Sequence, residues 1–322
     1  MVDFLTRLPM VSFGAVYVGV IWGVMAIGVY LTFRVLDFAD LTVDGTIPLG
    51  AAVSGVCIVM GANPTVSLFV AFLAGTIAGL ITALLHTKLG IHPILAGILT
   101  QISFDTAINL HIMGIPYGWS NMRNGQANIS LLNERTVFSD MIDFFKLDSN
   151  NMVAKNAVGI LIGVIALAVI IALVHWFLCT QKGFAMRATG INPKMARAMG
   201  ISTDNMIILG LMISNGIIAL GGALAGQMNG FADSGLGKGS IVVGLAAVII
   251  GEVIFGKRSL LQHIIAVALG SVVYRWIYSF VMLTGVLPPI DAKLLTAIMV
   301  ALALAMPVIR EKSMQRKQKK IK

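Results

Sequence analysis

The sequence is poor in charged residues. Only 11% of its 322 residues are Asp, Glu, Lys or Arg, whereas 57% are hydrophobic. About a quarter of a soluble domain is charged, and a soluble protein this apolar would expose large adhesive patches. The apolar residues also form runs of about 20, long enough to cross a hydrocarbon layer about 30 Å thick. The composition therefore excludes an ordinary soluble protein and predicts a membrane protein.

Cysteine is equally scarce. Cys57 and Cys179 are the two cysteines, and both lie inside or beside apolar runs. Two such positions support neither a disulfide framework nor a cysteine metal site. The five histidines show no pair at i, i+4, and no nucleophile with a matching base stands out. We therefore expect no metal site and no enzymatic activity in this chain.

A nucleotide-binding motif is also missing, although the segment at 229–240 is rich in glycine. A phosphate loop of the form G-x-x-x-x-G-K-[ST] would need different residues at Ala232 and Gly239. The glycines at 235, 237 and 239 lack the G-x-G-x-x-G spacing of a dinucleotide turn. The segment is predicted to be a flexible turn, either external or embedded in the membrane. Any chemical energy that the protein uses must then come from a partner.

The net charge of +9 does not indicate nucleic acid binding. Most basic residues lie at the ends of apolar runs or in the tail at 310–322, where seven Lys and Arg accompany Glu311. Such clustering is typical of cytoplasmic segments beside anionic lipid headgroups. We expect contact with membrane lipid and no nucleic acid partner.

The apolar runs predict an all-α, polytopic transmembrane helix bundle. Clear spans are expected at 12–33, 64–85, 157–178, 206–227, 260–283 and 289–309. Shorter or interrupted spans are expected at 46–61, 91–113 and 240–256. Together they give about 8–10 spans, some short or broken, in a single domain over residues 1–322. No cleavage site follows the first run, so it is expected to be retained.

Charge in the connecting loops predicts the orientation. The loop at 179–205 has four basic residues against one acid, and a basic pair lies at 257–258. Both are positive-inside signals. Acidic and basic residues balance in the segment at 114–156, which is therefore expected outside. The C-terminus then lies in the cytoplasm, while the side of the N-terminus stays open because a short span could be re-entrant.

Small residues recur four apart within the predicted spans, for example Gly75 with Gly79 and Gly222 with Gly226. Small side chains let helices approach closely where lipid provides no hydrophobic drive for association. Internal packing of the bundle is the favoured interpretation, and a dimer interface is the alternative.

The basic loop at 179–205 contains a short helix with clear ends. Asn192 is a good N-cap, and Pro193 suits the first helical position. Gly200 stands where a left-handed residue commonly ends a helix. A helix over 193–199 is too short to be stable alone in water, so it must dock. The groove of a partner protein and the lipid surface are both possible docking places.

A longer pattern surrounds this helix. It runs G, then R-A-x-G-x-N, then A-R-x-x-G-I, at positions 183, 187–192 and 196–201, and L-x-x-S-N-G-I-I-A-L-G-G-A-L-A-G follows at 211–226. The pattern resembles the coupling loop and next span of the permease family that serves branched-chain amino acids, ribose and related sugars. The resemblance implies that the loop couples the chain to an ATPase, through Arg187, Gly190, Asn192, Pro193, Lys194, Ala196, Arg197 and Gly200.

That resemblance implies the permease subunit of an ATP-binding-cassette (ABC) importer in a bacterial inner membrane. Two copies, or this chain with a related one, would form the solute pathway. Two ATPase subunits would bind ATP and Mg, and an external substrate-binding protein would deliver the solute. This chain itself would hold no cofactor.

A second resemblance lies near the N-terminus. The run F-A-D-L-T-V-D-G-T at 38–46 is similar to the family's D-L-S-V-G-S segment, which begins a broken span near the translocation path. Asp44 is an additional acid that we do not expect in the sugar-type members. This departure places the sequence nearer a less characterised branch associated with tryptophan and tyrosine, which it resembles over nearly the whole chain.

Polar residues at membrane depth are candidates for the pathway. One set, Asp40 and Asp44, flanks the Gly- and Pro-interrupted short span. Broken helices expose backbone groups where they line a cavity. The other set is spaced four apart within 91–113 and would share a helix face. Two interpretations are open for each set: its residues line the solute path, or they make structural hydrogen bonds. The candidates are Asp40, Asp44, Gly45, Gln101, Asp105 and Asn109.

Two further charged residues receive structural interpretations. Arg275 lies among Tyr274, Trp276 and Tyr278, which resemble an interfacial aromatic belt and favour a snorkelling guanidinium over a substrate clamp. Glu252 is expected to pair with the basic residues at 257–258 rather than to relay protons.

Two other classes of function are weighed against the importer. An ion-gradient-driven secondary transporter is the alternative, with Asp105 and Glu252 as proton carriers. A membrane-bound enzyme has only the embedded acids in its favour. Few buried charges along the spans favour an amphiphilic amino acid over a polyanion as the solute.

Overall fold

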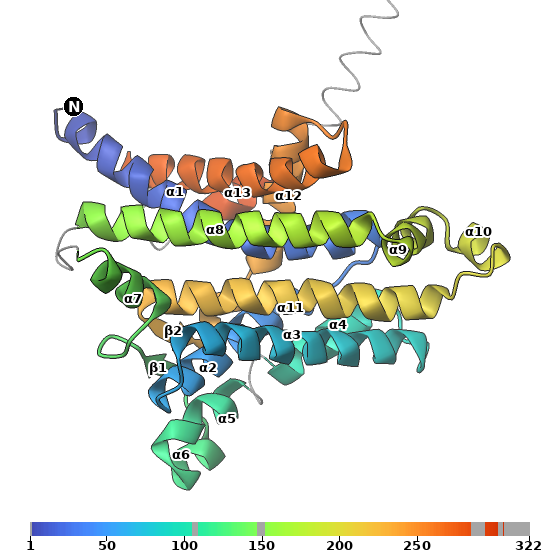
Figure 1. Cartoon of the computed structure of the whole chain (residues 1–322), viewed down its shortest axis with the longest axis horizontal. Helices are drawn as coiled ribbons and strands as arrows, with labels where there is room; N and C mark the ends of the chain where they lie inside the picture. Colours follow the sequence, from blue (N-terminus) through green and yellow to red (C-terminus); the bar gives the residue numbers. More distant parts are fainter. Residues whose placement is uncertain (1, 105–108, 147–151, 285–293, 302–304, 306–322) are drawn as a thin grey trace, which may run out of the picture.

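The structure, a computed structural model, describes residues 2–104, 109–146, 152–284, 294–301 and 305. Figure 1 shows a bundle whose long helices follow the long axis of the molecule. Within the described ranges, six helices are long and apolar enough to cross a membrane: Leu8–Val35, Pro64–Thr87, Lys155–Leu178, Thr203–Asn229, Ser234–Phe255 and Leu260–Leu283. Two shorter apolar helices are Val43–Val59 and Pro93–Ile102. The all-α class is confirmed.

The last predicted span and the basic tail are covered only in part. Residues 294–301 are helical, and Leu295 and Met299 are buried against residues of α12 (Ser240–Phe255) and α13 (Leu260–Leu283). Most of the predicted span at 289–309 and the whole tail at 310–322 lie outside the described residues. The six long helices, the two short ones and this helical piece fall within the predicted range of spans.

The first span ends in an irregular turn that sends the chain into the core. Helix α1 (Val2–Tyr30) continues into a π-helical turn, η1 (Leu31–Val35), in which the Leu36 N–H donates to the Leu31 carbonyl at 3.1 Å. Asp37 then adopts a left-handed backbone conformation, with φ of 52°. Such π-turns are rare and often lie at functional sites. The chain reverses here, so the next helix begins inside the bundle.

That next helix, α2 (Val43–Val59), is buried along most of its length. It packs against α3 (Pro64–Thr87) and α11 (Thr203–Asn229). A Cβ at Gly50 of α2 would collide with the carbonyl of Ala219 on α11, and one at Gly222 would collide with the carbonyl of Ile47. The two backbones therefore touch directly, as small residues allow in a membrane.

The glycines of α3 are packed in the same way. A Cβ at Gly75 would collide with the carbonyl of Asn215 on α11, and one at Gly79 with that of Leu211. Gly226 of α11 lies against α2. Internal packing is therefore confirmed for these predicted small-residue pairs.

Short elements follow α3 along the chain, and several of them pack against α2. These are α4 (Pro93–Ile102), α5 (Asn109–Gly114), η3 (Ile115–Tyr117), α6 (Trp119–Asn124), β1 (Asn128–Ser130) and α7 (Val137–Phe144). Strand β1 pairs antiparallel with β2 (Phe231–Asp233), with Ile129 opposite Ala232. The prediction of a flexible turn at 229–240 is therefore wrong. This segment contains β2, which is paired with β1, and the 3-10 helix η4 (Ser234–Gly237).

The second half supplies four more long helices. They are α8 (Met152–Leu178), α11, α12 (Ser240–Phe255) and α13 (Leu260–Leu283). Helix α1 packs against all four. Two short helices, α9 (Gln181–Ile191) and α10 (Pro193–Ala198), join α8 to α11 at the end opposite β1 and β2 (Figure 1).

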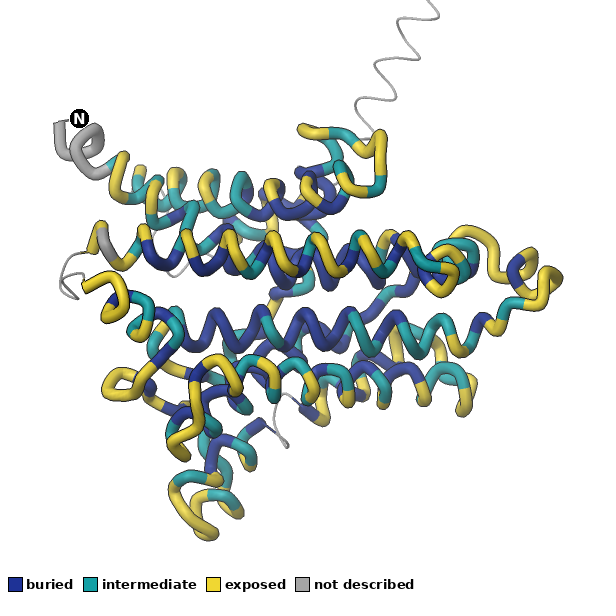
Figure 2. The backbone as a smooth tube through the Cα atoms, viewed as in Figure 1, coloured by how far each residue is buried: buried dark blue, intermediate teal, exposed yellow. Residues whose placement is uncertain are grey.

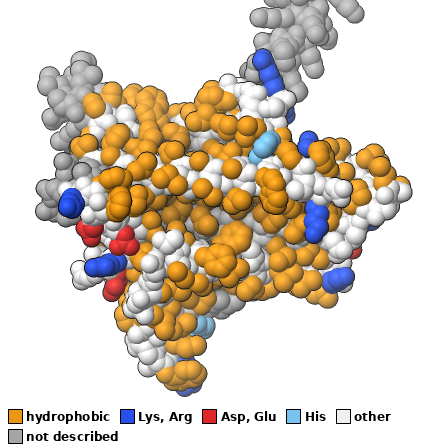
Figure 3. Space-filling model, viewed as in Figure 1, with side chains coloured by type: hydrophobic (Ala, Val, Ile, Leu, Met, Phe, Trp, Pro, Cys, Tyr) orange, Lys and Arg blue, Asp and Glu red, His pale blue; other side chains and the backbone are white. Residues whose placement is uncertain are grey.

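Burial and charge follow the long axis. Figure 2 shows α11 buried over much of its length, whereas the α9–α10 end and the loops at the other end are exposed. On the face shown in Figure 3, hydrophobic side chains cover the middle, and Lys and Arg lie toward the ends. This is the distribution expected of a bundle that crosses a bilayer along its long axis.

Candidate functional site

Helix α9 lies directly on two spans. Thr180 caps it, because its hydroxyl oxygen accepts the Gly183 N–H at 3.3 Å. A Cβ at Gly183 would collide with the last turn of α8, and one at Gly190 with the carbonyl of Val35 in η1. Our sequence reasoning did not predict this helix. Thr180 as an N-cap was the local signal that marks its start.

Helix α10 has the predicted ends. The Asn192 side-chain oxygen accepts the Met195 N–H at 3.0 Å, and Pro193 occupies the first helical position. Gly200 has φ of 81°, and its N–H donates to the Arg197 carbonyl at 2.9 Å. The short helix between Asn192 and Gly200 is therefore confirmed, with its helical residues at Pro193–Ala198.

One side of α10 is fastened to the start of α11. Ala196 is fully buried, and the Arg197 Nε donates to the Thr203 hydroxyl at 2.7 Å. The Arg197 guanidinium also lies 3.9 Å from the Asp204 carboxylate. That exposed ion pair contributes little by itself. Movement of α10 is nonetheless tied to α11 through the buried side chain and the short hydrogen bond.

The other side of α10 is open and apolar. Ile191 is 82% exposed, Met199 72% and Met195 47%, and Lys194 is exposed beside them. We refer to these four residues as the α10 surface. It lies at the tip of the bundle, beyond the ends of α8 and α11 (Figure 1). Exposed apolar side chains grouped in this way are typical of an interaction surface.

A buried polar cluster holds the start of α2. Asp40, which is 3% exposed, accepts the Thr42 N–H at 2.9 Å and the Asn215 side-chain amide at 2.7 Å. The Thr46 hydroxyl donates to Asn215 at 2.9 Å, and the hydroxyls of Thr42 and Thr82 lie 2.8 Å apart. Both Asp40 carboxylate oxygens therefore have protein partners, which favours a structural role. A role for Asp40 in the pathway stays a prediction.

Asp44 joins the start of α2 to the start of α12. One carboxylate oxygen accepts the Gly239 N–H at 3.0 Å, and the other accepts the Ile241 N–H at 2.8 Å. These are N–H groups at the beginning of a helix, where a negative charge is stabilising. The glycine-rich segment is thus held by an acid nearly 200 positions earlier in the chain.

Removing this cap gives a direct test of what Asp44 does. Asp44→Ala is expected to lower the thermal midpoint of the detergent-purified protein, because loss of a helix cap costs about 1–2 kcal/mol. Asp44→Asn retains an acceptor and should lose less. Glu134→Ala, at an exposed acid outside any helix, is the matched control. A loss of solute uptake at unchanged stability would instead assign Asp44 to the pathway.

The structure brings Gly45 and Asn109 together with the backbone of Gln101. The Asn109 amide is fully buried and donates to the Gly45 carbonyl at 3.4 Å, and a Cβ at Gly45 would lie 3.1 Å from the Gln101 Cα. Within the segment at 91–113, predicted to be a short or interrupted span, α4 covers Pro93–Ile102, a π-helical turn follows at 103–104, and α5 begins at Asn109. Residues 105–108 lie outside the described residues, so the shared helix face stays a prediction. Asp105 lies outside the described residues.

Glu252 has different partners from those predicted. Its carboxylate lies 2.6 Å from the Arg34 guanidinium and 2.8 Å from the His263 Nε2. The Tyr30 hydroxyl lies 3.4 Å from the other ring nitrogen of His263. The predicted pairing with the residues at 257–258 is wrong, because Glu252 pairs with Arg34, next to the last residue of the first span. The local ion pair itself is present, and it joins η1, α12 and α13.

Arg275 also differs from its predicted role. Its guanidinium lies 4.4 Å from the centre of the Trp22 ring on α1 and 5.9 Å from that of Tyr278. Tyr274 is buried in the bundle, whereas Trp276 is exposed and stacks on Phe280. The snorkelling interpretation is therefore wrong, because cation–π contacts hold the guanidinium against the bundle.

Comparison with known proteins identifies the family. The sequence profile for the permease component of branched-chain amino acid transport systems matches residues 11–304. The chain belongs to this family. It is therefore the membrane-spanning permease subunit of an ABC importer, as the resemblance of the coupling loop predicted.

Two relatives span most of the permease. The tyrosine transport system permease protein of Clostridioides difficile (strain R20291) is 35% identical over 88% of this chain and 87% of its own length. An uncharacterized protein, RP368, of Rickettsia prowazekii (strain Madrid E) is 33% identical over 87% of this chain and 92% of its own length. Among solved structures, an inward-facing metal-chelate-type ABC transporter gives a TM-score of 0.43 at 14% identity, covering 94% of this chain and 86% of that one.

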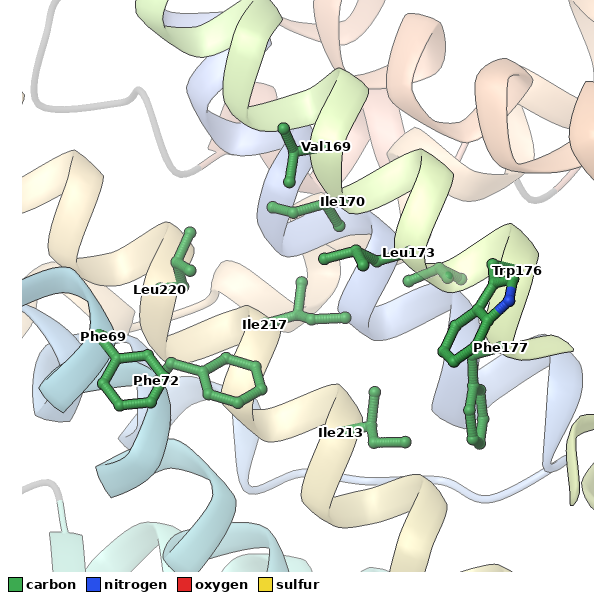
Figure 4. A pocket seen from close by; sticks show the side chains of 11 residues that line it. Phe69, Phe72, Val169, Ile170, Leu173, Trp176, Phe177, Ile213, Ile217 and Leu220 are labelled. Carbon is green, nitrogen blue, oxygen red and sulfur yellow. The ribbon is translucent and has the colours of Figure 1, made fainter. Parts of the chain in front are cut away.

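A large apolar groove on the permease does not fit a polar solute. It has a volume of about 460 Å³ and is formed by side chains of α3, α8 and α11. Figure 4 shows Phe69 and Phe72 on one side and Val169 and Leu173 on the other. Solute sites contain a few placed polar groups for recognition, and these walls are aliphatic and aromatic. The groove suits lipid chains instead.

Proposed function

We propose that the permease forms the pathway by which an ABC importer brings an aromatic amino acid across a bacterial inner membrane. The observation that carries this proposal is the α10 surface. A capped, rigid helix with open apolar side chains protrudes from the bundle, and its other side is fastened to a span. A helix of this kind can receive a push from a soluble ATPase and pass it to the spans.

The α9–α10 end is proposed to face the cytoplasm. This end carries the basic loop at 179–205 and the basic turn at 257–258, whereas the described part of the charge-balanced segment at 114–156 lies away from it. The positive-inside rule therefore supports this orientation. The basic tail at 310–322 would then lie in the cytoplasm as well.

The mechanical connection runs through α9 and α10. Two ATPase subunits would bind ATP and Mg and close on each other. Their movement would push α10, which is bonded to α11, and α9, which lies on α8 and η1. Because α9 and α10 together contact three spans, this movement would change the side of the membrane to which the pathway is open. The pathway would be formed with a second permease copy or a related chain. An external binding protein would deliver the solute.

The proposed solute follows from a relative named for tyrosine transport and from the branch resemblance. The relative that is 35% identical over most of both chains is named for tyrosine transport. Asp44, Gly45, Gln101 and Asn109 meet where α2 begins and α4 ends, so this is the proposed region of the path.

Uptake assays in proteoliposomes test the proposal. Permease reconstituted with its ATPase is expected to take up labelled tyrosine or tryptophan only when ATP and the binding protein are supplied. Uptake should persist when a protonophore collapses the ion gradient. The opposite pattern, with uptake independent of ATP and abolished by the protonophore, would establish the secondary transporter instead.

A further inference from the structure

A basic crevice lies beside α9 and shares Ile191 with the α10 surface. It has a volume of about 290 Å³, and its walls come from the end of the first span, from α9 and from the turn before α13. Its basic side chains are Arg34, Arg187, Lys257, Arg258 and His263. Elements far apart in sequence therefore place five basic groups around one small volume.

Most of this positive charge is not neutralised by the protein. Glu252 pairs with Arg34 at 2.6 Å and with His263 at 2.8 Å. Among the described residues, no carboxylate lies within 4.0 Å of Arg187, Lys257 or Arg258. The Arg187 guanidinium stacks over the Phe184 ring at 5.5 Å instead. Like charges held this close repel one another, and a bound anion would relieve the repulsion.

The crevice also lies at a defined depth. The first candidate span ends at Val35 and the sixth begins at Leu260, and both residues line the crevice. The ends of apolar spans mark the level of the lipid headgroups. Ile191 adds a third apolar side chain to the walls. The site is therefore amphipathic, with cations and apolar surface side by side.

Helix α13 adds to the positive potential. It is 24 residues long, and Ser259, its N-cap, accepts the Gln262 N–H at 3.2 Å. Ser259 and Leu260 both line the crevice, so the positive end of this helix dipole opens into it. Phosphate groups are commonly bound where helix N-termini and basic side chains meet.

We propose that this crevice binds the phosphate group of an anionic phospholipid from the adjacent leaflet. Arg187, Lys257 and Arg258 would contact the phosphate oxygens, and the three apolar side chains would pack against the glycerol and the first methylenes. The charge accounts for a phosphate, and the depth and apolar walls favour a lipid over free phosphate. Because Arg187 belongs to α9, the bound lipid would brace the helix that connects two spans.

The test uses the full permease–ATPase complex. In native mass spectrometry, the complex is expected to retain phosphatidylglycerol in preference to phosphatidylcholine. Lys257→Gln/Arg258→Gln should weaken retention about tenfold or more, since each basic residue near an anionic surface adds about 1 kcal/mol. Lys257→Arg/Arg258→Lys keeps both charges and should bind normally. Lys182→Gln, an exposed residue of the same end outside the crevice, is the matched control.

The outcomes separate the possible sources of the anion. Phosphatidylglycerol that stays bound in excess inorganic phosphate supports a lipid, whereas displacement by inorganic phosphate overturns the lipid assignment. Unchanged retention by the Gln double variant, at unchanged thermal midpoint, also overturns the proposal. The proposal is also overturned if the Gln double variant loses its bound ATPase but still retains phosphatidylglycerol. The crevice would then be a contact with the ATPase. Lipid binding at the crevice requires only that the permease lies in a membrane. Failure of the lipid proposal therefore does not affect the transport proposal.

Discussion

ATP-driven uptake is expected to fall by tenfold or more when Met195 and Met199 are both replaced by glutamate. Both side chains lie on the exposed side of α10, so the permease should fold and insert normally. Placing two carboxylates in an apolar contact removes its packing and leaves buried charges, and central contacts of this kind are worth about 2 kcal/mol or more. Uptake and co-purification of the ATPase, measured on the same membranes, should fall together.

The matched control changes exposed methionines at the other end of the bundle. Met60 and Met152 are 66% and 62% exposed and lie near the ends of α2 and α8 that are remote from α10. Met60→Glu/Met152→Glu should leave both measurements close to the parent values. Normal uptake and normal ATPase binding by the α10 double variant would show that the ATPase docks elsewhere.

Gly50→Ala is expected to destabilise the permease, although glycine to alanine normally stabilises a helix by about 1 kcal/mol. The added methyl would collide with the carbonyl of Ala219, where α2 and α11 touch. A carbonyl in a helix backbone cannot rotate away, so the two helices must separate. Overpacking of this kind typically costs about 1–3 kcal/mol, and the thermal midpoint in detergent should fall accordingly.

Gly14→Ala supplies the comparison within the same protein. The nearest neighbour of a Cβ at Gly14 is the Asn156 side chain at 3.8 Å, an ordinary contact. This variant should match or exceed the parent in stability. If Gly50→Ala behaved like Gly14→Ala, the close packing of α2 against α11 would not describe the folded protein.

The elements that the sequence predicted well are those with local causes. Apolar runs of about 20 residues have to cross the hydrocarbon layer as helices, because unsatisfied backbone groups are costly in lipid. The ends of α10 followed from Asn192 and Gly200, each acting on N–H or carbonyl groups a few residues away. Helix α9 was missed because Gly183 and Gly190, which weaken an isolated helix, are needed here for contact with α8 and η1.

The partners of the charged residues were predicted less well. Glu252 was assigned to the basic residues at 257–258 because they are close in sequence, yet its carboxylate meets Arg34, 218 positions away. Arg275 was likewise interpreted from the aromatic residues beside it in sequence, yet its guanidinium lies over the Trp22 ring of α1. Such partners depend on helix packing and cannot be read from sequence spacing.

By itself, the sequence determined that this chain is a helical membrane protein, which family it resembles, and that a short helix lies between Asn192 and Gly200. These follow from hydrophobicity, charge placement and capping, whose effects act within one or two helical turns. Only the tertiary structure decided that Asp44 caps α12, that Gly50 lies against Ala219, and that five basic groups surround one crevice. Such contacts join residues distant in sequence, so their energies depend on how the helices pack.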